Sequence, residues 1–126
     1  MKKQYFLVII FVCISSCDPA GTTIIEFKNN SSINLSIELL LNGAVSKGNG
    51  IFNVMKNKSY VYKYSSIDRY DNPNEKLGKI LFYDLDSKEL VKEKVVDKET
   101  FTLIKEQKNG LGMDGYFKIE IDDDLL

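Results

Sequence analysis

Apolar and polar residues alternate strictly over residues 33–39, and this alternation constrains the fold more than any other feature of the sequence. The apolar positions share one face: Ile33, Leu35, Ile37 and Leu39. A period of two is typical of a β-strand with one buried and one solvated face. The same pattern returns over residues 116–121. We therefore expect a β-sheet with one face in a hydrophobic core.

Clusters of turn-forming residues divide the rest of the chain into similar short segments. Seven or eight strands are predicted, at residues 22–27, 33–40, 51–55, 59–65, 79–85, 90–96, 101–105 and 116–121. Turns at intervals of about 8–12 residues are typical of a sandwich or a barrel. The predicted fold is all-β: a small antiparallel β-sandwich, immunoglobulin-like or transthyretin-like, with a small barrel as second choice. No helix is expected after Cys17.

The first 16 residues have the pattern of a secretory signal peptide. Lys2 and Lys3 precede ten apolar residues at 5–14, and two serines follow. A membrane-spanning helix needs about 20 apolar residues, so this run is too short to remain as a span. Residues 1–16 are predicted to be removed, which leaves a lipidated N-terminus and tether at 17–21 and one β domain at 22–126.

The end of the signal, Ile14-Ser15-Ser16-Cys17, resembles the lipobox of bacterial lipoproteins. This resemblance implies cleavage before Cys17 and a lipid on its sulfur, which would hold the protein to a membrane of the cell envelope. The outer membrane is favoured over the inner one. The alternative is an ordinary secretory signal with a chance cysteine.

Charge and composition exclude several classes of function. Without Lys2 and Lys3, 15 basic and 18 acidic side chains remain, and Arg69 is the single arginine, so nucleic-acid binding is not expected. The chain has no histidine, and no free thiol remains once Cys17 carries lipid. Ser–His and Cys–His nucleophiles and ordinary zinc sites therefore cannot be built. We expect a protein that is not an enzyme and that uses no cofactor or metal.

Two polar segments, residues 66–76 and 108–115, are the predicted binding loops, because long surface loops are freer to vary than strands. Their candidate contact residues are Asp68, Arg69, Tyr70, Asp71, Asn109 and Met113. The sequence thus favours a binding or structural module that presents loops or an edge strand to an envelope protein, a peptide or a glycan. A small envelope enzyme or inhibitor acting through the same loops is the alternative.

Three other groups have weaker interpretations. Oxygen-bearing residues crowd one loop but lack EF-hand spacing, so turn formation is favoured over calcium binding: Asp68, Asp71, Asn72, Asn74 and Glu75. A second acidic group is also assigned to a turn and not to a catalytic carboxylate pair: Asp84, Asp86 and Glu89. An aromatic stripe is assigned to the core or to a half-covered face in preference to a binding surface: Tyr60, Tyr62 and Tyr64.

Overall fold

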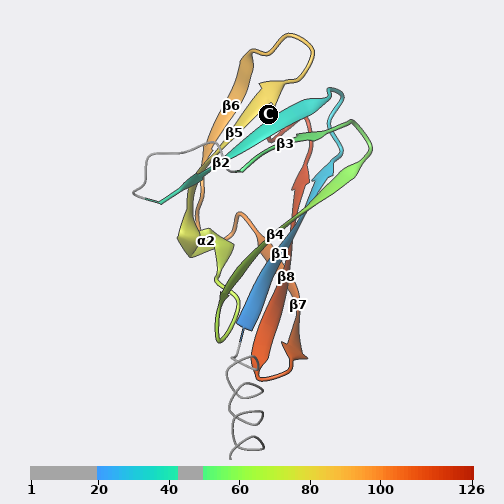
Figure 1. Ribbon diagram of the computed structural model, residues 1–126. Helices are drawn as coiled ribbons and strands as arrows, with labels where there is room; N and C mark the ends of the chain where they lie inside the picture. The colour runs from blue at the N-terminus through green and yellow to red at the C-terminus, as the bar shows by residue number, and fades with distance from the viewer. Residues whose placement is uncertain (1–19, 43–49) are drawn as a thin grey trace, which may run out of the picture.

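Two four-stranded β-sheets pack against each other in the computed structural model, which describes residues 20–42 and 50–126 (Figure 1). The first sheet has the strand order β4-β1-β8-β7 and the second β3-β2-β5-β6. The elements are β1 (Ala20–Asn29), β2 (Leu35–Leu41), β3 (Ile51–Val54), β4 (Ser59–Ile67), α2 (Pro73–Lys76), β5 (Leu77–Asp84), β6 (Leu90–Val95), β7 (Thr102–Asn109) and β8 (Gly112–Ile121). The predicted β-sandwich is confirmed. The predicted signal peptide and Cys17 lie outside the described residues.

The first and last strands lie side by side. β1 pairs with β4 in antiparallel register but with β8 in parallel register, from Thr23 opposite Gly115 to Asn29 opposite Ile121. Every other pair of named strands in the described residues is antiparallel. The expectation of an antiparallel sandwich therefore holds except at β1–β8. A parallel pair needs a long connection, and here the whole intervening chain supplies it.

The core lies where the two sheets face each other. Phe27 of β1 is completely buried, 4.8 Å from the ring of Phe52 on β3 and 5.9 Å from Phe101, measured between ring centres. Alternation places Ile37 of β2 and Phe82 of β5 on the facing side, both fully buried. Apolar burial of this kind is the main stabilising term in a sandwich of this size.

The tyrosine stripe of β4 is the half-covered margin of that core. Tyr60 stacks on Phe52 with 4.3 Å between ring centres but is still 38% exposed. Tyr62 and Tyr64 are partly buried and pack against the core. The interpretation as a half-covered face agrees with this packing.

The expected loop at residues 108–115 is wrong, because β7 and β8 continue to a tight turn at Gly110 and Leu111. Gly110 has a φ of +62°, which is why glycine suits the turn. Gly112 and Gly115 have a different role, since a Cβ on either would collide with Ala20 or with the ring of Tyr70. Glycine within a strand often marks such a close approach and not a loop.

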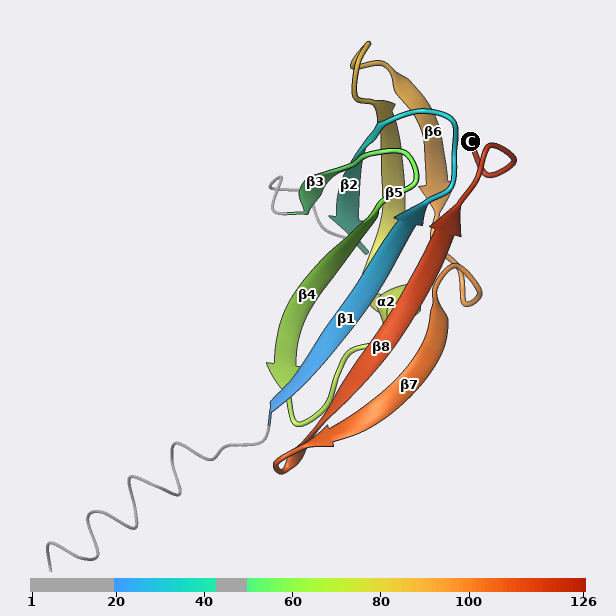
Figure 2. The same cartoon turned by 90° about the vertical axis from the view of Figure 1, so that its right-hand side faces the viewer.

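The two sheets do not cover each other completely. In Figure 2 the first sheet extends well beyond the second at the end where β1 begins. On that half, α2 and the segment before it lie beside the first sheet, where the second sheet is absent (Figures 1 and 2). We call this half the single-sheet region, and the other half the two-sheet region. Within the described ranges, no helix has the length and apolar character needed to cross a bilayer.

Candidate binding groove

Residues 68–71 cross the single-sheet region and are held there by backbone hydrogen bonds. The Tyr70 N–H donates to the Met113 carbonyl at 2.9 Å, and the Met113 N–H donates to the Asp68 carbonyl at 3.2 Å. Gly21 of β1 lies against the segment, and a Cβ there would overlap the segment's backbone. The segment therefore behaves as a short pairing strand and not as a free loop.

Tyr70 fills the space that the second sheet leaves open. It is 8% exposed, its ring lies against Gly115, and it meets Phe117 with 5.6 Å between ring centres. Its hydroxyl bonds to the carboxylate of Glu106 on β7. Burial raises the pKa of Tyr70 above 10.0, and the hydrogen bond to Glu106 adds to the rise. The Arg69 guanidinium lies 4.9 Å from the Tyr70 ring centre and 3.3 Å from Glu106 Oε1.

Asp71 fixes the next part of the segment through both its backbone and its side chain. The Thr23 hydroxyl donates to the Asp71 carbonyl at 2.8 Å and accepts from the Asp71 N–H at 2.9 Å. The carboxylate accepts from the Ser66 hydroxyl at 2.7 Å and from Lys76 Nζ at 3.1 Å. These donors, Ser66 first, hold the pKa of Asp71 below its usual value. A carboxylate bonded in this way is a structural group.

Helix α2 is a single turn that is held in place by Asn72 and Asn74, and the expectation that no helix follows Cys17 is therefore wrong. The Asn72 side chain caps it by accepting from the Asn74 N–H, and Pro73 occupies the first helical turn. Asn74 Nδ2 donates to the carbonyls of Lys98 and Phe101, and Asn74 Oδ1 accepts from the Phe101 N–H at 2.8 Å. The side chain of Asn74 thus joins this segment to the connection between β6 and β7.

A groove of about 590 Å³ runs between this segment and the start of β7. We call it the Tyr70 groove; its lining is Arg69, Tyr70, Asp71, Asn72, Asn74, Glu75, Lys98, Phe101, Leu103 and Phe117. The aromatic rings are mostly buried, whereas Leu103 is 46% exposed and Arg69 projects into solvent. The groove therefore offers one apolar contact point inside a rim of mixed charge, with walls held in place by hydrogen bonds.

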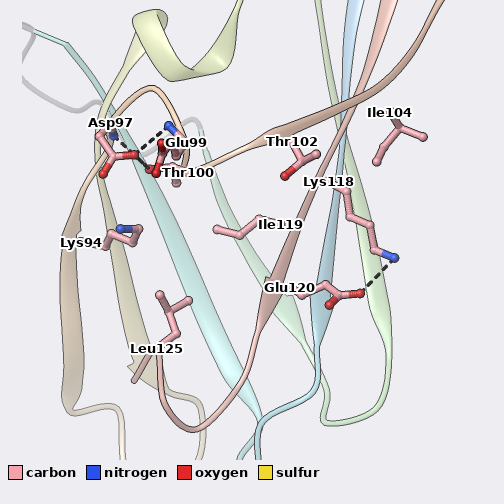
Figure 3. Close-up of a pocket in the computed structure, with 10 residues that line it drawn as sticks. All are labelled: Lys94, Asp97, Glu99, Thr100, Thr102, Ile104, Lys118, Ile119, Glu120 and Leu125. Carbon is pink, nitrogen blue, oxygen red and sulfur yellow. Dashed lines mark hydrogen bonds and ion pairs between the residues drawn. The ribbon is translucent and has the colours of Figure 1, made fainter.

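Figure 3 shows a second groove, of about 510 Å³, which reaches Leu125 near the C-terminus. Charged side chains line much of it, but several are already engaged. Lys118 pairs with Glu120 at 3.2 Å, and the Asp97 carboxylate accepts from the Glu99 N–H at 2.8 Å. The Glu99 N–H and the Thr100 hydroxyl lower the pKa of Asp97, as expected for a turn carboxylate. Among the described residues, Lys94 and Glu99 form no ion pair here, and Glu75 and Lys98 form none in the Tyr70 groove, so the two grooves do not differ in this respect. The Tyr70 groove differs in containing the predicted contact residues Arg69, Tyr70 and Asp71.

The structure brings the two predicted binding loops together. Arg69 pairs with Met113 in a parallel bridge, and Asp68 bonds to the same residue. Tyr70 and Asp71 are held within the fold, so Tyr70 cannot be the exposed contact that was expected. Asn109 pairs with Gly112 across the turn and does not reach the Tyr70 groove.

Four residues that shape this site were missed by sequence reasoning: Thr23, Glu106, Phe101 and Leu103. They stand on strands or beside them, and nothing in their local sequence indicates that residues 68–74 fold back over them. The Asn72-Pro73 pair was a usable signal, since a capping residue followed by proline marks the start of a helix. Among residues 20–42 and 50–126, no group of three or more acidic side chains is arranged to hold a metal ion.

Comparison with known proteins does not identify a function for this chain. The sequence matches no protein-family model and no curated protein.

Proposed function

We propose that this protein is a bacterial envelope lipoprotein, anchored by lipid on Cys17, that binds an extended peptide of another envelope protein in the Tyr70 groove. One observation carries the proposal. Strand β1 begins at Ala20, at one end of an elongated sandwich (Figure 2), whereas the Tyr70 groove is lined by the segment at residues 69–75 and by the start of β7. An anchor placed at the end of the domain does not compete with a partner on its side.

The edge strand β7 supports a peptide as the ligand. It is the outermost strand of the first sheet, and all eight of its residues are exposed. An edge strand carries backbone donors and acceptors that an extended peptide can pair with, while a neighbouring groove selects side chains. Lys105, Lys108 and an irregularity between Leu103 and Lys105 disfavour pairing with a second copy of this edge.

The charges on the rim support a polar partner. Arg69 is 63% exposed at its side chain and pairs with Glu106 at 3.3 Å, so it can exchange this partner for a ligand carboxylate at small cost. Glu75 and Lys98 stand further along the same rim. The binding-module function thus uses Leu103 as apolar contact and Arg69 as a charged one, with no catalytic residue.

The anchor is tested by Cys17→Ser in the full chain expressed in a bacterium. We expect loss of labelled-lipid incorporation and an uncut precursor. A Cys17→Ser protein that is still cleaved and still labelled would refute lipidation at this residue.

The groove is tested by photo-crosslinking in intact cells, with a crosslinking residue at Leu103. Leu90 on β6 is the matched control, because it is also leucine and is 51% exposed, against 46% for Leu103. We expect a discrete adduct with an envelope protein from position 103, weakened by Arg69→Ala, and none from position 90. Equal adducts from both positions, or none from position 103, would contradict the proposal.

A further inference from the structure

The end of the domain where the chain enters carries two unusually exposed apolar side chains. Ile67, the last residue of β4, is 84% exposed, and Leu111, in the β7–β8 turn, is 77% exposed. Every other large apolar side chain in the described ranges is 65% exposed or less. Single exposed apolar side chains are common on soluble proteins, but two such side chains at one end of a domain can indicate an interaction surface.

Both residues flank the start of β1. Ile67 stands directly opposite Ala20 in the β1–β4 register. Leu111 precedes Gly112, whose backbone packs so closely on Ala20 that a Cβ would overlap the Ala20 carbonyl. In Figures 1 and 2 the end of β4, the β7–β8 turn and the start of β1 lie at the same end of the molecule.

We propose that Ile67 and Leu111 form a lipid-contacting tip that enters the surface of the membrane in which Cys17 is anchored. The proposal rests on lipidation of Cys17. Cys17 precedes Ala20 by three residues, and three residues of extended chain span about 11 Å at most. A domain held so close to its acyl chains presents this end to the bilayer, so the lipid surface is the nearest occupant for the two side chains.

The charges at the tip favour apolar insertion over attraction to headgroups. Asp68 and Arg69 follow Ile67 and carry opposite signs, so they supply no net charge next to it. Anionic lipid would attract a cluster of basic residues, and the described residues at this tip form no such cluster. The fold also holds the tip in place, because hydrogen bonds through Met113 join the segment after Ile67 to the strand after Leu111.

The consequence of this contact is orientation. Two or three acyl chains already retain the protein at the membrane, so the tip is not needed for affinity. A lipid chain alone leaves the domain free to rotate about its tether, whereas two inserted side chains fix one end against the surface. The Tyr70 groove, which begins at Arg69, then stands at a constant height and angle above the bilayer.

The natural chain has no tryptophan, which makes the depth of single positions measurable. Ile67→Trp and Leu111→Trp are introduced separately into the lipidated full chain, with Leu90→Trp as the control. Leu90 is the first residue of β6, and β6 begins at the end of the molecule opposite the start of β1 (Figure 1). Each protein is placed in vesicles of phosphatidylethanolamine and phosphatidylglycerol, with and without bromine on the acyl chains. We expect a blue shift and a loss of tryptophan emission in brominated vesicles at positions 67 and 111, and neither change at position 90.

The outcomes separate this inference from the proposed function, because the mass of the N-terminal peptide is measured on the same samples. Lipid on Cys17 without quenching at positions 67 and 111 overturns the tip and leaves the anchor standing. Equal quenching at all three positions, or a blue shift that depends on protein density and not on bromine, also overturns it; the latter would indicate a second copy of the chain. Absence of lipid on Cys17 removes the anchor and the tip together.

A variant without the two apolar side chains tests the predicted orientation independently. Ile67→Ser combined with Leu111→Ser changes only exposed side chains, so the fold should be unaffected. The double change is made in the lipidated Leu90→Trp protein. In aligned bilayers, the orientation of the tryptophan at position 90 should be distributed more broadly than in the Leu90→Trp protein without the double change. An unchanged orientation would overturn the proposal.

Discussion

The same sheet is covered in two different ways along its length. In the two-sheet region, the inner face of β1 meets the second sheet through apolar rings such as Phe27 and Phe52. In the single-sheet region, one buried tyrosine and a set of hydrogen bonds to residues 68–74 cover that face. Apolar burial is non-directional, whereas hydrogen bonds need partners at set positions. The apolar packing of the two-sheet region therefore tolerates small changes of shape, whereas the packing of the single-sheet region depends on a few hydrogen-bonding atoms.

The largest expected effect is in the two-sheet region. Phe27→Ala should lower the free energy of unfolding by about 3–5 kcal/mol, because it removes a fully buried ring and leaves a cavity. Val61→Ala, on the exposed side of β4, is the control and should change it by less than about 0.5 kcal/mol. Urea unfolding of both variants measures the difference, and similar midpoints would show that the sandwich core is not the main source of stability.

A methyl group at Gly21 tests whether residues 68–71 are a built part of the fold. Gly21→Ala should cost about 1–3 kcal/mol, since the added Cβ overlaps the segment's backbone and must displace it. Limited proteolysis should then cut near Arg69 faster than in the parent. Gly110→Asn is the control, because asparagine tolerates the positive φ and no atom lies within 4 Å of a Cβ there. Equal cleavage in both variants would contradict the built segment.

Asn74 tests the hydrogen bonds alone. Asn74→Ala removes the partner of the Phe101 N–H and of two carbonyls, and it should cost about 1–3 kcal/mol. Asn109→Ala, on an exposed strand end, should stay within about 0.5 kcal/mol. Thermal unfolding followed by circular dichroism compares the two, and a loss at Asn109 equal to that at Asn74 would remove the special role of the latter.

The smallest effect is expected at Tyr64, where the two regions meet. Its hydroxyl is buried without a hydrogen-bond partner, since the nearby Thr23 hydroxyl is bonded to Asp71. Removing an unsatisfied buried hydroxyl is nearly neutral or stabilising, so Tyr64→Phe should change stability by about 0–1 kcal/mol in the favourable direction. Tyr60→Phe is the exposed control.

The same variant has a predicted pH dependence. Burial raises the pKa of Tyr64 to about 12. Between the unfolded value of 10.0 and about 12, the unfolded chain loses the phenolic proton first, so stability falls as pH rises through this window. Tyr64→Phe should make that alkaline loss smaller, and Tyr60→Phe should not. Urea midpoints on either side of pH 10 measure the slope, and equal slopes in both variants would contradict the assignment.

Local pattern was sufficient for most of the strands. The alternation over residues 33–39 correctly predicts that Leu35, Ile37 and Leu39 face the core. The predicted strand begins two residues before β2, which starts at Leu35. Ile33 belongs to the preceding turn, because the Asn29 side chain donates a hydrogen bond to its carbonyl. At residues 108–115 glycine was interpreted as a loop signal, although the requirement for glycine there comes from contacts across the sheet.

By itself, the sequence determined that the domain is all-β and built of short strands, because side-chain period and turn residues act over a few neighbours along the chain. Only the tertiary structure decided that β8 runs parallel to β1 and that residues 68–74 cover the sheet next to β7. It also decided that Ile67 lies opposite Ala20 on one side and that Leu111 precedes the glycine packed on Ala20 from the other side. These contacts join residues tens of positions apart. Such contacts depend on how well distant parts of the chain pack together, and a local sequence pattern does not contain that information.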